Sequence, residues 1–473
     1  MAINPKDRKA THIPPRQRRH LPAHHRQFVR RQPRQGPSQV SEGLIPGLQG
    51  ATQWPFVLFT PKNWLLLKML SLTFISSMPR IAIIGYGVVG RALGGVVAAK
   101  VRGAEIVAYD SKVTGRSAGK IRLAKTLPRA LKGADFLFLC VPSHLKGEGV
   151  SGAGWKDLAK QIARYAELAG IVVIKSTLVP GDVGRLEAMT KRRVVVCPEF
   201  MSEGTAERDI LKPHRVLVGG RDKDAVEAVV SLYRAWVPAS RIIRMDAWSS
   251  QLAKLLANVM LAQRVSSINS LTALCEKSGG DIRAVANAVG RDPRIGREFL
   301  NASPGFGGSC LEKDLRMLVA LAKCLGHPEV AKYWQSVIDL NDRHIRRVTR
   351  AICMAAGRGG KVAVFGLAFK GGVNDVRNSP SLRIIDGLVA CGHPVTAYDP
   401  RVKPLKGLTI ESRASAAAQG ASVIAILTND VSFKKMDWRQ LASAGTAIYD
   451  AHGIIQPEAI SSLRLISLGR SSR

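Results

Sequence analysis

The sequence predicts an α/β protein with two doubly wound parallel sheets, joined by a central helical domain that contains a long helix. Three observations predict this fold class. The apolar run 81–84 is followed at once by closely spaced glycines and an apolar helical segment. The same order returns at 361–366 with fewer glycines. Between these halves, residues 248–276 contain neither proline nor glycine, as a long helix requires.

The composition is that of a globular protein. The chain has 473 residues, of which 46% are apolar and 22% are charged. These values exclude a mainly disordered, collagen-like or coiled-coil protein. Seven cysteines are scattered without a C-x-x-C pair, which argues against a disulfide scaffold and a cysteine-based metal site. We therefore expect no metal and a reducing compartment, the cytoplasm.

The net charge of +35 allows two interpretations. It could attract nucleic acid, membranes or phosphorylated metabolites, or it could be diffuse surface charge. Beyond residue 78 the basic residues form no long run. We therefore favour diffuse charge and expect neither nucleic acid nor a membrane as a partner.

Residues 1–77 differ from the rest of the chain. Residues 1–40 are rich in Pro, Gln, Arg and His and have no apolar period, which is typical of disorder. Residues 54–77 are apolar, but two prolines and two lysines leave no run long enough for a membrane span. We expect 1–77 to be a disordered extension or an over-extended gene model, with a targeting or membrane element as the alternative.

The glycine-rich turn after the first apolar run is the clearest motif. It reads Gly85-Tyr-Gly87-Val88-Val89-Gly90. Glycines at these places permit a tight turn, close approach of a pyrophosphate, and close packing of the next helix on the strand. Asp110 ends the second apolar run, where an acid binds ribose hydroxyls and favours NAD over NADP. This predicts a Rossmann-like NAD site, with a glycine turn in another α/β protein as the alternative.

Further apolar runs follow at the spacing of alternating strands and helices. They lie at 135–142, 171–177, 194–198, 395–399, 422–428 and 446–450. Several of them end in polar residues. Because the carboxyl ends of parallel strands lie at the edge where ligands bind, we expect these polar residues at a site.

A cysteine and two helical residues are further candidates for chemistry. Cys310 follows three glycines and is predicted to open a helix with Lys313 in its first turn, which favours a nucleophilic thiolate. The alternative is a small buried thiol. Lys254 and Asn258 are four residues apart and share a face of the predicted long helix. They either face a common site or are two solvated polar residues, and spacing alone favours the latter.

Taken together, these motifs are similar to those of the nucleotide-sugar dehydrogenases, the UDP-glucose/GDP-mannose dehydrogenase family. The likeness runs from Met78 to near the C-terminus and rests on several segments in the family's order. These segments are 85–90, 175–181, 197–206, 214–220, 254–258, 294–296, 305–314 and 369–377.

The resemblance implies a NAD-dependent, four-electron oxidation of the C6 hydroxyl of UDP-glucose to the uronate. Cys310 would attack the intermediate aldehyde to give a thiohemiacetal, and oxidation of this adduct would give a thioester that water cleaves. Lys254 and Asn258 would hold the developing oxyanion. Asp314 would act as a base through a water, with help from Thr177 and Glu199.

The resemblance also implies the residues of each part of the site. The catalytic set is Cys310, Lys254, Asn258, Asp314, Thr177 and Glu199. The cofactor set is Gly85, Gly87, Val88, Val89, Gly90, Asp110, Thr177, Glu203, Lys313 and Arg377. The substrate set is Glu199, Phe200, Met201, Ser202, Lys254, Asn258, Arg294, Phe299, Leu300, Asn301, Gly305, Phe306, Gly307, Phe369 and Lys370.

Three domains are expected after the N-terminal extension. They are a NAD-binding domain at 78–245, a central helical and dimerisation domain at 246–350, and a Rossmann-like UDP-sugar-binding domain at 358–473. The expected partners are a nucleotide-sugar substrate and a second copy of the chain, bound through the central domain. Arg294 would reach the substrate across that dimer interface.

Three departures from the family's pattern leave the sugar nucleotide open. Cys197 stands where Asn or Ser is usual, the loop after Val141 is altered, and His452 replaces a substrate-binding arginine. The alternative is therefore a sister enzyme that acts on GDP-mannose or a UDP-N-acetylhexosamine. A simpler β-hydroxyacid dehydrogenase, which needs no cysteine, is a further alternative. A nucleic-acid or membrane-associated protein rests on the basic N-terminus alone.

Overall fold

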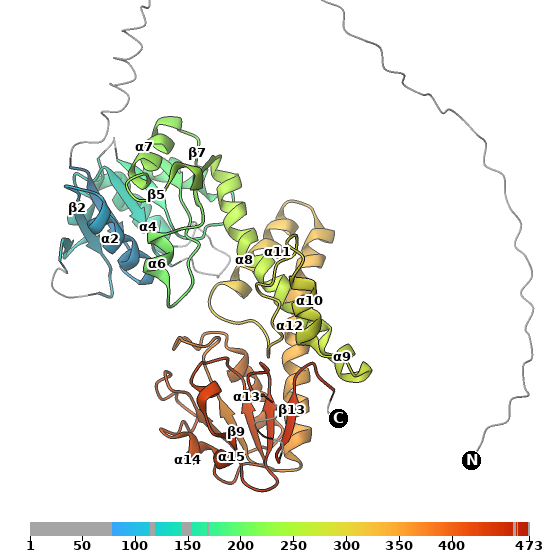
Figure 1. Cartoon of the computed structure of the whole chain (residues 1–473). Coiled ribbons are helices and arrows are strands. Elements are labelled where there is room, and N and C mark those ends of the chain that lie inside the picture. Colours follow the sequence, from blue (N-terminus) through green and yellow to red (C-terminus); the bar gives the residue numbers. More distant parts are fainter. Residues whose placement is uncertain are drawn as a thin grey trace, which may run out of the picture. The chain divides into compact units, whose positions relative to one another are not determined.

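The computed structural model describes residues 78–113, 119–142, 153–167, 170–456, 460 and 462–471. The expectation for residues 1–77 lies outside the described residues. The elements alternate between strands and helices, are interrupted by a run of helices, and then alternate again (Figure 1). This arrangement confirms the predicted fold class.

The first sheet has eight strands in the described part of the chain, in the order β3-β2-β1-β4-β5-β6-β7-β8. All neighbours are parallel except β6 and β7, which are antiparallel. The strands are β1 (Arg80–Ile84), β2 (Glu105–Tyr109), β3 (Ile121–Leu123), β4 (Phe136–Leu139), β5 (Ile171–Ile174), β6 (Arg193–Val196), β7 (Val216–Gly220) and β8 (Ile242–Met245). The strand order reverses between β1 and β4, which creates a crevice at their carboxyl ends.

Helices cover both faces of this sheet. They are α2 (Val88–Lys100), α3 (Leu127–Leu131), α4 (Ala153–Tyr165), α5 (Asp182–Thr190), α6 (Ala206–Leu211) and α7 (Lys223–Tyr233). Successive residues of β1 point to opposite faces. Ile83 therefore packs in the core that contains α2 and α7, and Ile84 packs in the core that contains α3 and α4. A continuous apolar run is needed because both faces are covered.

The central helices are α8 (Ala247–Ser270), α9 (Thr272–Ser278), α10 (Ile282–Gly290), α11 (Leu311–Cys324) and α12 (Pro328–Ala356). Asp246 caps α8 by accepting the Ser249 N–H at 2.8 Å. The sequence predicts one helix over 248–276, but α8 ends at Ser270. The Thr272 hydroxyl donates to the Asn269 carbonyl at 2.6 Å, and such side-chain bonds compete with the helical ladder.

The second sheet is parallel throughout, in the order β10-β9-β11-β12-β13. Its strands are β9 (Val362–Phe365), β10 (Val395–Tyr398), β11 (Val423–Ile426), β12 (Ala447–Asp450) and β13 (Arg464–Ser467). Its helices are α13 (Pro380–Ala390), α14 (Ala414–Ala418) and α15 (Trp438–Leu441). The long helix α12 contributes Ile345, Val348 and Ile352 to the core of this sheet.

The end of the chain is joined to the central helices. The Ile282 N–H donates to the Gly469 carbonyl at 2.9 Å, and the Gly469 N–H donates to Glu276 Oε1 at 2.8 Å. Arg347 of α12 pairs with the other oxygen of Glu276 at 2.7 Å. Residues far apart in sequence therefore complete the turn between α9 and α10.

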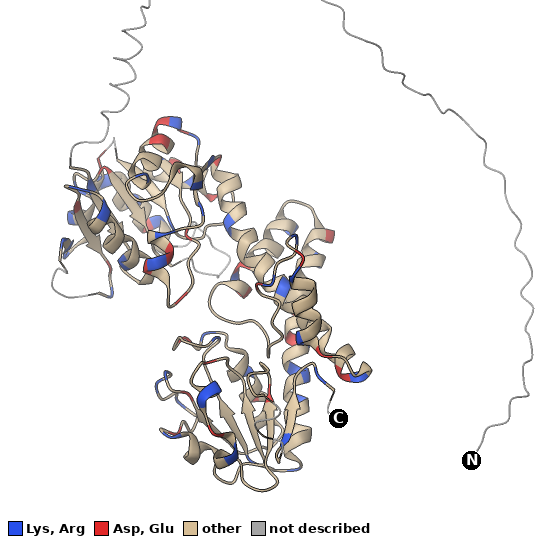
Figure 2. Cartoon of the chain, in the orientation of Figure 1, with Lys and Arg blue, Asp and Glu red and all other residues tan. Residues whose placement is uncertain are grey.

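Charged residues are spread over the molecule. Figure 2 shows Lys and Arg on the helices and loops around both sheets and on the central helices, with Asp and Glu among them. Several of these residues pair locally, as Arg244 does with Glu227 and Arg316 with Glu312. Such a distribution is that of diffuse surface charge.

Candidate active site

The turn between β1 and α2 has the shape of a dinucleotide-binding turn. Gly85 has a φ of +93°, and its N–H donates to the Tyr109 carbonyl at 2.9 Å. A Cβ at Gly90 would overlap the Gly85 carbonyl oxygen, whereas a Cβ at Gly87 would meet nothing within 4 Å. Val88 is exposed and Val89 is half-buried. Gly87 therefore lines open space at the helix N-terminus, where a pyrophosphate fits.

Asp110 stands beside this turn with capacity to accept further hydrogen bonds. Its Oδ2 accepts the Tyr86 N–H at 2.8 Å, and its Oδ1 accepts the Lys112 N–H at 2.8 Å. A carboxylate has about four lone-pair sites, so both oxygens can still accept from ribose hydroxyls. The described first turn of α2 contains no acid that would repel phosphate. The residues present therefore fit NAD.

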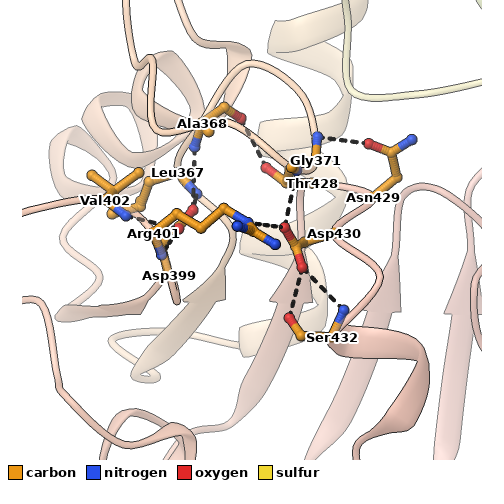
Figure 3. Close-up of polar contacts among 11 residues, drawn as sticks. Leu367, Ala368, Gly371, Asp399, Arg401, Val402, Thr428, Asn429, Asp430 and Ser432 are labelled. Atoms are coloured by element: carbon orange, nitrogen blue, oxygen red, sulfur yellow. Dashed lines mark hydrogen bonds and ion pairs between the residues drawn. The ribbon is translucent and has the colours of Figure 1, made fainter. Parts of the chain in front are cut away.

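The turn after β9 is similar to the turn after β1, but every acceptor site of its aspartate is already used (Figure 3). Asp399 Oδ2 accepts the N–H groups of Leu367 and Ala368 at 2.7 and 3.3 Å. Its Oδ1 accepts those of Arg401 and Val402 at 2.8 and 3.1 Å. All four lone-pair sites are used, so Asp399 fixes the turn.

Asp430 lies beside this second turn and is nearly buried. Its carboxylate accepts from Arg401 Nε and from the N–H groups of Gly372 and Ser432, each at 3.0 Å (Figure 3). Burial alone would raise the pKa of Asp430, but these donors hold it well below its ordinary value. The carboxylate therefore stays charged and braces the loop after β11.

Glu199 and Lys254 form a buried ion pair at the carboxyl edge of the first sheet. Glu199 follows β6, and its Oε1 lies 3.1 Å from Lys254 Nζ of α8. Its Oε2 accepts the Met201 N–H at 3.0 Å. Burial alone would raise the pKa of Glu199, but Lys254 and the Met201 N–H hold it below its ordinary value. Glu199 is therefore a carboxylate and Lys254 its positive partner.

Asn258 and Asp314 are joined between α8 and α11. Asn258 Nδ2 donates to Asp314 Oδ2 at 2.6 Å. Asp314 is fully buried, and its Oδ1 lies 2.7 Å from Lys313 Nζ. The predicted cation beside Cys310 thus pairs with the next residue in the chain. Lys254 and Asn258, one turn apart on α8, bind two different carboxylates.

Cys310 is an exposed thiol at the N-cap of α11. Its Sγ lies 3.5 Å from Ser309 Oγ. The Gly308 N–H donates to the Arg377 carbonyl at 3.0 Å, and a Cβ at Gly308 would press on the ring of Phe369. The glycine loop therefore runs close to the segment after β9, and Cys310 follows directly.

The start of the glycine loop is fixed by α12. Asn341 Oδ1 accepts the Phe306 N–H at 2.9 Å, and Asn341 Nδ2 donates to the Phe306 carbonyl at 3.2 Å. Gly305 has a φ of +151°, and a Cβ there would lie 2.8 Å from Asn341 Oδ1. A side chain is therefore excluded at Gly305. A side chain at Gly307 is excluded in the same way, because its Cβ would overlap the Asn378 carbonyl oxygen.

Glu203 lies in a cluster of charged groups. Lys370 Nζ donates to the Glu203 carbonyl at 2.9 Å, and Arg377 Nη2 lies 3.8 Å from Glu203 Oε2. Arg377 also pairs with Asp375 Oδ2 at 2.5 Å. Burial, a hydrogen bond with Asp375 and the charge of Asp375 raise the pKa of Glu203. The expected cofactor residues Glu203 and Arg377 therefore already contact each other.

A cavity of about 810 Å³ adjoins Glu199. Its lining includes Glu199, Phe200, Met201, Ser202 and Phe299, five of the expected substrate residues. The Arg215 guanidinium lies 3.9 Å from the centre of the Phe200 ring. The remaining lining residues are Lys175, Pro198, Thr205, Arg208, Asp209, Ile210, Lys212, Pro213, His214, Arg215, Val216, Tyr233 and Glu298.

Other expected residues have local partners. Arg294 pairs with Asp292 at 2.6 Å, and its side chain is 88% exposed. Asn301 Oδ1 accepts from Arg297 at 2.6 Å, while Leu300 is buried. Thr177 follows β5 and is half-buried. Among the described residues, no group of three or more His, Cys, Asp or Glu is placed to hold a metal ion.

Sequence reasoning missed several residues that organise the site. Asn341 lies within the long helix α12 and Tyr233 ends α7, and nothing in their spacing distinguishes them from packing residues. Asp375 lies inside the quoted segment 369–377, but its role as the partner of Arg377 depends on the fold. Lys175 ends a buried strand, which is a signal that could have been used.

The glycine turn at the switch point of one sheet, with a second parallel sheet and central helices, defines a dehydrogenase with two Rossmann-like sheets. The chain belongs to the UDP-glucose/GDP-mannose dehydrogenase family. The family's NAD binding domain matches residues 111–237, its central domain 248–343 and its UDP binding domain 363–457. The cofactor is therefore NAD, and the C-terminal sheet belongs to a UDP binding domain.

Known relatives resemble most of the chain. UDP-glucose 6-dehydrogenase 1 of Oryza sativa subsp. japonica is 33% identical, with 83% of this chain and 97% of the relative covered. UDP-glucose 6-dehydrogenase of Caenorhabditis elegans is 37% identical, with 73% and 81% covered. A UDP-glucose dehydrogenase structure from Pyrobaculum islandicum has a TM-score of 0.72 at 24% identity and covers 84% of this chain and 98% of its own. That structural likeness concerns the fold alone.

A membrane span was also sought. Within the described ranges, no helix combines the length and the apolar character that crossing a bilayer requires.

Proposed function

We propose that this chain oxidises the C6 hydroxyl of UDP-glucose to the carboxylate of UDP-glucuronate in two NAD-dependent steps at one site. The observation that carries the proposal is the 2.6 Å bond between Asn258 and Asp314, one turn after Cys310. It gathers an amide donor, a carboxylate and a thiol at the junction of α8 and α11. The similarity to UDP-glucose 6-dehydrogenases over most of the chain supports UDP-glucose as the substrate.

The first oxidation removes a proton and a hydride from the C6 alcohol. Asp314, acting through a water, takes the hydroxyl proton, with Thr177 and Glu199 as hydrogen-bonding partners. NAD supplies the chemistry of hydride acceptance, once in each of the two oxidations. Lys254 and Asn258 donate to the oxygen as negative charge develops on it.

The second oxidation uses a covalent bond to the enzyme. The thiolate of Cys310 adds to the aldehyde carbon, and the carbonyl oxygen becomes the hydroxyl of a thiohemiacetal. Loss of a proton and a hydride from this adduct leaves a thioester. Water then adds to the thioester carbon, and the Cys310 thiolate departs as the uronate forms. Glu203 flanks the sugar and the hydrolytic water.

The substrate residues divide between two regions. Phe200, Met201, Ser202 and Phe299 line the cavity beside Glu199, which supports a sugar-binding role. The glycine loop of Gly305, Phe306 and Gly307, with Leu300 and Asn301, lines the rest of the substrate site. Phe369 and Lys370 follow β9 of the second sheet and complete it. Lys370 now donates to the Glu203 carbonyl, so substrate binding exchanges that bond.

The cofactor residues also divide. Gly85, Gly87, Val88, Val89, Gly90 and Asp110 bind the dinucleotide at the first turn. Thr177, Glu203, Lys313 and Arg377 complete the cofactor site. Arg377 is held by Asp375 through three hydrogen bonds of 2.5–2.9 Å, which orients its guanidinium. We take the functional domains as 78–245, 246–350 and 358–473.

A homodimer through the central domain completes the proposal. Large apolar side chains are exposed along one run of central helices, where Leu256 and Met260 lie one turn apart on α8, as do Val285 and Val289 on α10. Such pairs are typical of a surface that a partner covers. Arg294 is exposed nearby in the chain, which suits the proposed contact with the partner's substrate.

The compartment follows from the thiols. All seven cysteines lie in the described part and are free. Free thiols, with an exposed Cys310 among them, suit a reducing environment, and we infer the cytoplasm.

The direct test is substrate profiling with NADH counted per acid. Purified protein is given UDP-glucose, GDP-mannose and UDP-N-acetylglucosamine in separate reactions. We expect two NADH per UDP-glucuronate and far slower reaction with the other two. Turnover of GDP-mannose without turnover of UDP-glucose would overturn the proposed substrate, and one NADH per product would overturn the four-electron reaction.

A further inference from the structure

Lys175 carries a charge that is almost fully buried at the wall of the cavity beside Glu199. It follows β5, and only 5% of its surface is exposed. Its Nζ donates to the Tyr233 hydroxyl at 3.2 Å and the Pro198 carbonyl at 3.3 Å, and lies 3.9 Å from Cys197 Sγ. Among the described residues, no carboxylate forms an ion pair with it. This ammonium is therefore surrounded by a hydroxyl, a backbone carbonyl and a thiol.

A buried ammonium without an acid is costly. Transfer of a charge from water into a protein interior is unfavourable unless partners compensate for the lost hydration. Methionine or leucine would fill this space without that cost. The position of Lys175 therefore calls for a role in which its charge or its donors are used.

The contact with Pro198 points to that role. Pro198 precedes Glu199, so the Lys175 bond fixes the backbone from which the Glu199 side chain extends. From the other side, Lys254 reaches Glu199 Oε1 at 3.1 Å. Lys175 therefore holds this segment at the Pro198 carbonyl, and Lys254 holds it at the Glu199 carboxylate.

We propose that Lys175 is a positioning residue for the oxidation, which fixes the Pro198 carbonyl and thereby holds the Glu199 side chain opposite Lys254. The proposal rests on the role given to Glu199 under the proposed function. Lys175 itself touches no reacting atom in this scheme, because it acts through the backbone and through its charge.

The charges around Glu199 define what the proposal predicts. The charged and titratable groups that act on Glu199 are Lys254 from α8, Lys175 after β5 and Cys140 after β4. Lys175 contributes to the lowered pKa of Glu199, behind the larger effects of burial, Lys254 and the Met201 N–H. Without Lys175, the pKa of Glu199 rises toward that of a buried acid.

The first experiment measures pH profiles of kcat/KM for UDP-glucose in Lys175→Met, Lys175→Arg and Tyr233→Phe. We expect Lys175→Met to move the acid limb to higher pH, so that activity on that limb falls about threefold or more relative to the plateau. Lys175→Arg keeps the charge and should restore the limb. Tyr233→Phe removes only a neutral partner and should leave the limb in place.

Matched controls separate charge from folding. Lys160→Met makes the same chemical change on the exposed side of α4 and should leave the profile unchanged. Each variant's melting temperature and NAD affinity are measured to establish that the fold is kept. A folded Lys175→Met protein with the wild-type acid limb, kcat and KM would overturn the proposal.

The second experiment is independent of turnover. Lys175→Met, Glu199→Gln and the double variant form a cycle in the unfolding equilibrium constant. We expect the two effects to be coupled by about threefold or more. Additive effects would overturn the Lys175–Glu199 link. Coupling in a chain that oxidised no UDP-glucose would instead support the link and count against the proposed function.

Discussion

Asp110 and Asp399 occupy the same place in two turns that are almost 300 residues apart in sequence. Asp110 accepts the Tyr86 N–H at 2.8 Å, and Asp399 accepts the Leu367 N–H at 2.7 Å. The two carboxylates differ in how many backbone donors they hold. Asp110 accepts from two backbone N–H groups, whereas Asp399 accepts from four. The first is therefore open to a ligand and the second is committed to the fold.

Exchange of each acid for alanine should separate these roles. Asp110→Ala should weaken NAD binding more than NADP binding, because the carboxylate that binds ribose hydroxyls also repels a 2′-phosphate. Asp399→Ala should leave the NAD affinity unchanged and lower the free energy of unfolding by about 2 kcal/mol or more, since four donors lose their acceptor. Fluorescence titration with both cofactors and urea denaturation measure the two effects. Equal loss of NAD affinity in both variants would contradict the assignment.

Gly87 and Gly90 should respond differently to an added methyl group. Gly87→Ala places a Cβ in open space with φ −79°, so the melting temperature should be kept while NAD binding weakens about tenfold. Gly90→Ala drives a Cβ into the Gly85 carbonyl and should cost about 1–3 kcal/mol of stability. Thermal melts with and without NAD distinguish the two. A destabilised Gly87→Ala protein would show that this space is needed by the fold.

Cys310→Ser should arrest the reaction before the acid is released. A serine alkoxide is harder to form, and the ester it would give is a poorer acyl donor than a thioester. We expect production of the uronate to fall by about a thousandfold or more. Mass spectrometry of the quenched protein and a count of NADH per acid follow the stalled step. Cys324→Ser, an exposed thiol at the end of α11, is the matched control. Full four-electron turnover by Cys310→Ser would rule out the assigned nucleophile.

Asn258→Ala removes a donor from the proposed oxyanion site and leaves Asp314 without its 2.6 Å partner. Loss of one such donor typically lowers kcat by about 10²–10³-fold. The effect should fall on kcat more than on KM, because the donor acts mainly as charge develops. Steady-state kinetics with saturating NAD measure this. A change confined to KM would instead indicate that Asn258 only binds the substrate.

His344 should make stability depend on pH. Burial lowers the pKa of His344 to about 4, with its Nε2 bonded to the Ser303 carbonyl at 2.8 Å. The ordinary value is about 6.5, so the unfolded chain binds the extra proton between these values. The folded state therefore loses stability as the pH falls through this window. Between about pH 7 and pH 5, the free energy of unfolding of His344→Gln should fall by about 2 kcal/mol less than that of the wild type. Urea denaturation at both pH values tests this, and the exposed His327→Gln should match wild type.

The sequence predicted the elements whose signal is local. The run Ile81–Ile84, the glycine turn and Asp110 are recognisable because both faces of a central strand must be apolar and because glycine permits φ +93° at Gly85. The edge strands β3, β8 and β13 and the interior strand β7 were not predicted. The edge strands are short and partly exposed, as β8 is with its burial of only Ile242, so they lack a continuous apolar run.

The site was predicted in its residue types more than in its partnerships. Lys254 and Asn258 are expected to hold one oxyanion, and their spacing does not predict that they also pair with Glu199 and Asp314 from two other elements. Spacing on a helix gives a common direction, whereas the pairing depends on which loops the fold brings to that face. Lys175 was missed for the same reason, because its partners come from the segment after β6 and from α7.

The tie between Gly469 and the α9–α10 turn has a consequence for biosynthesis. The acceptor for the Ile282 N–H and the donor for Glu276 are made almost 200 residues after the helices they serve. While the ribosome is still translating, α9 and α10 therefore lack their hydrogen bonds with Gly469. The helices that position Arg294 reach their final packing only after the last strand has left the ribosome. Nascent chains stalled before that strand should be cut by protease near α10, whereas released chains should resist.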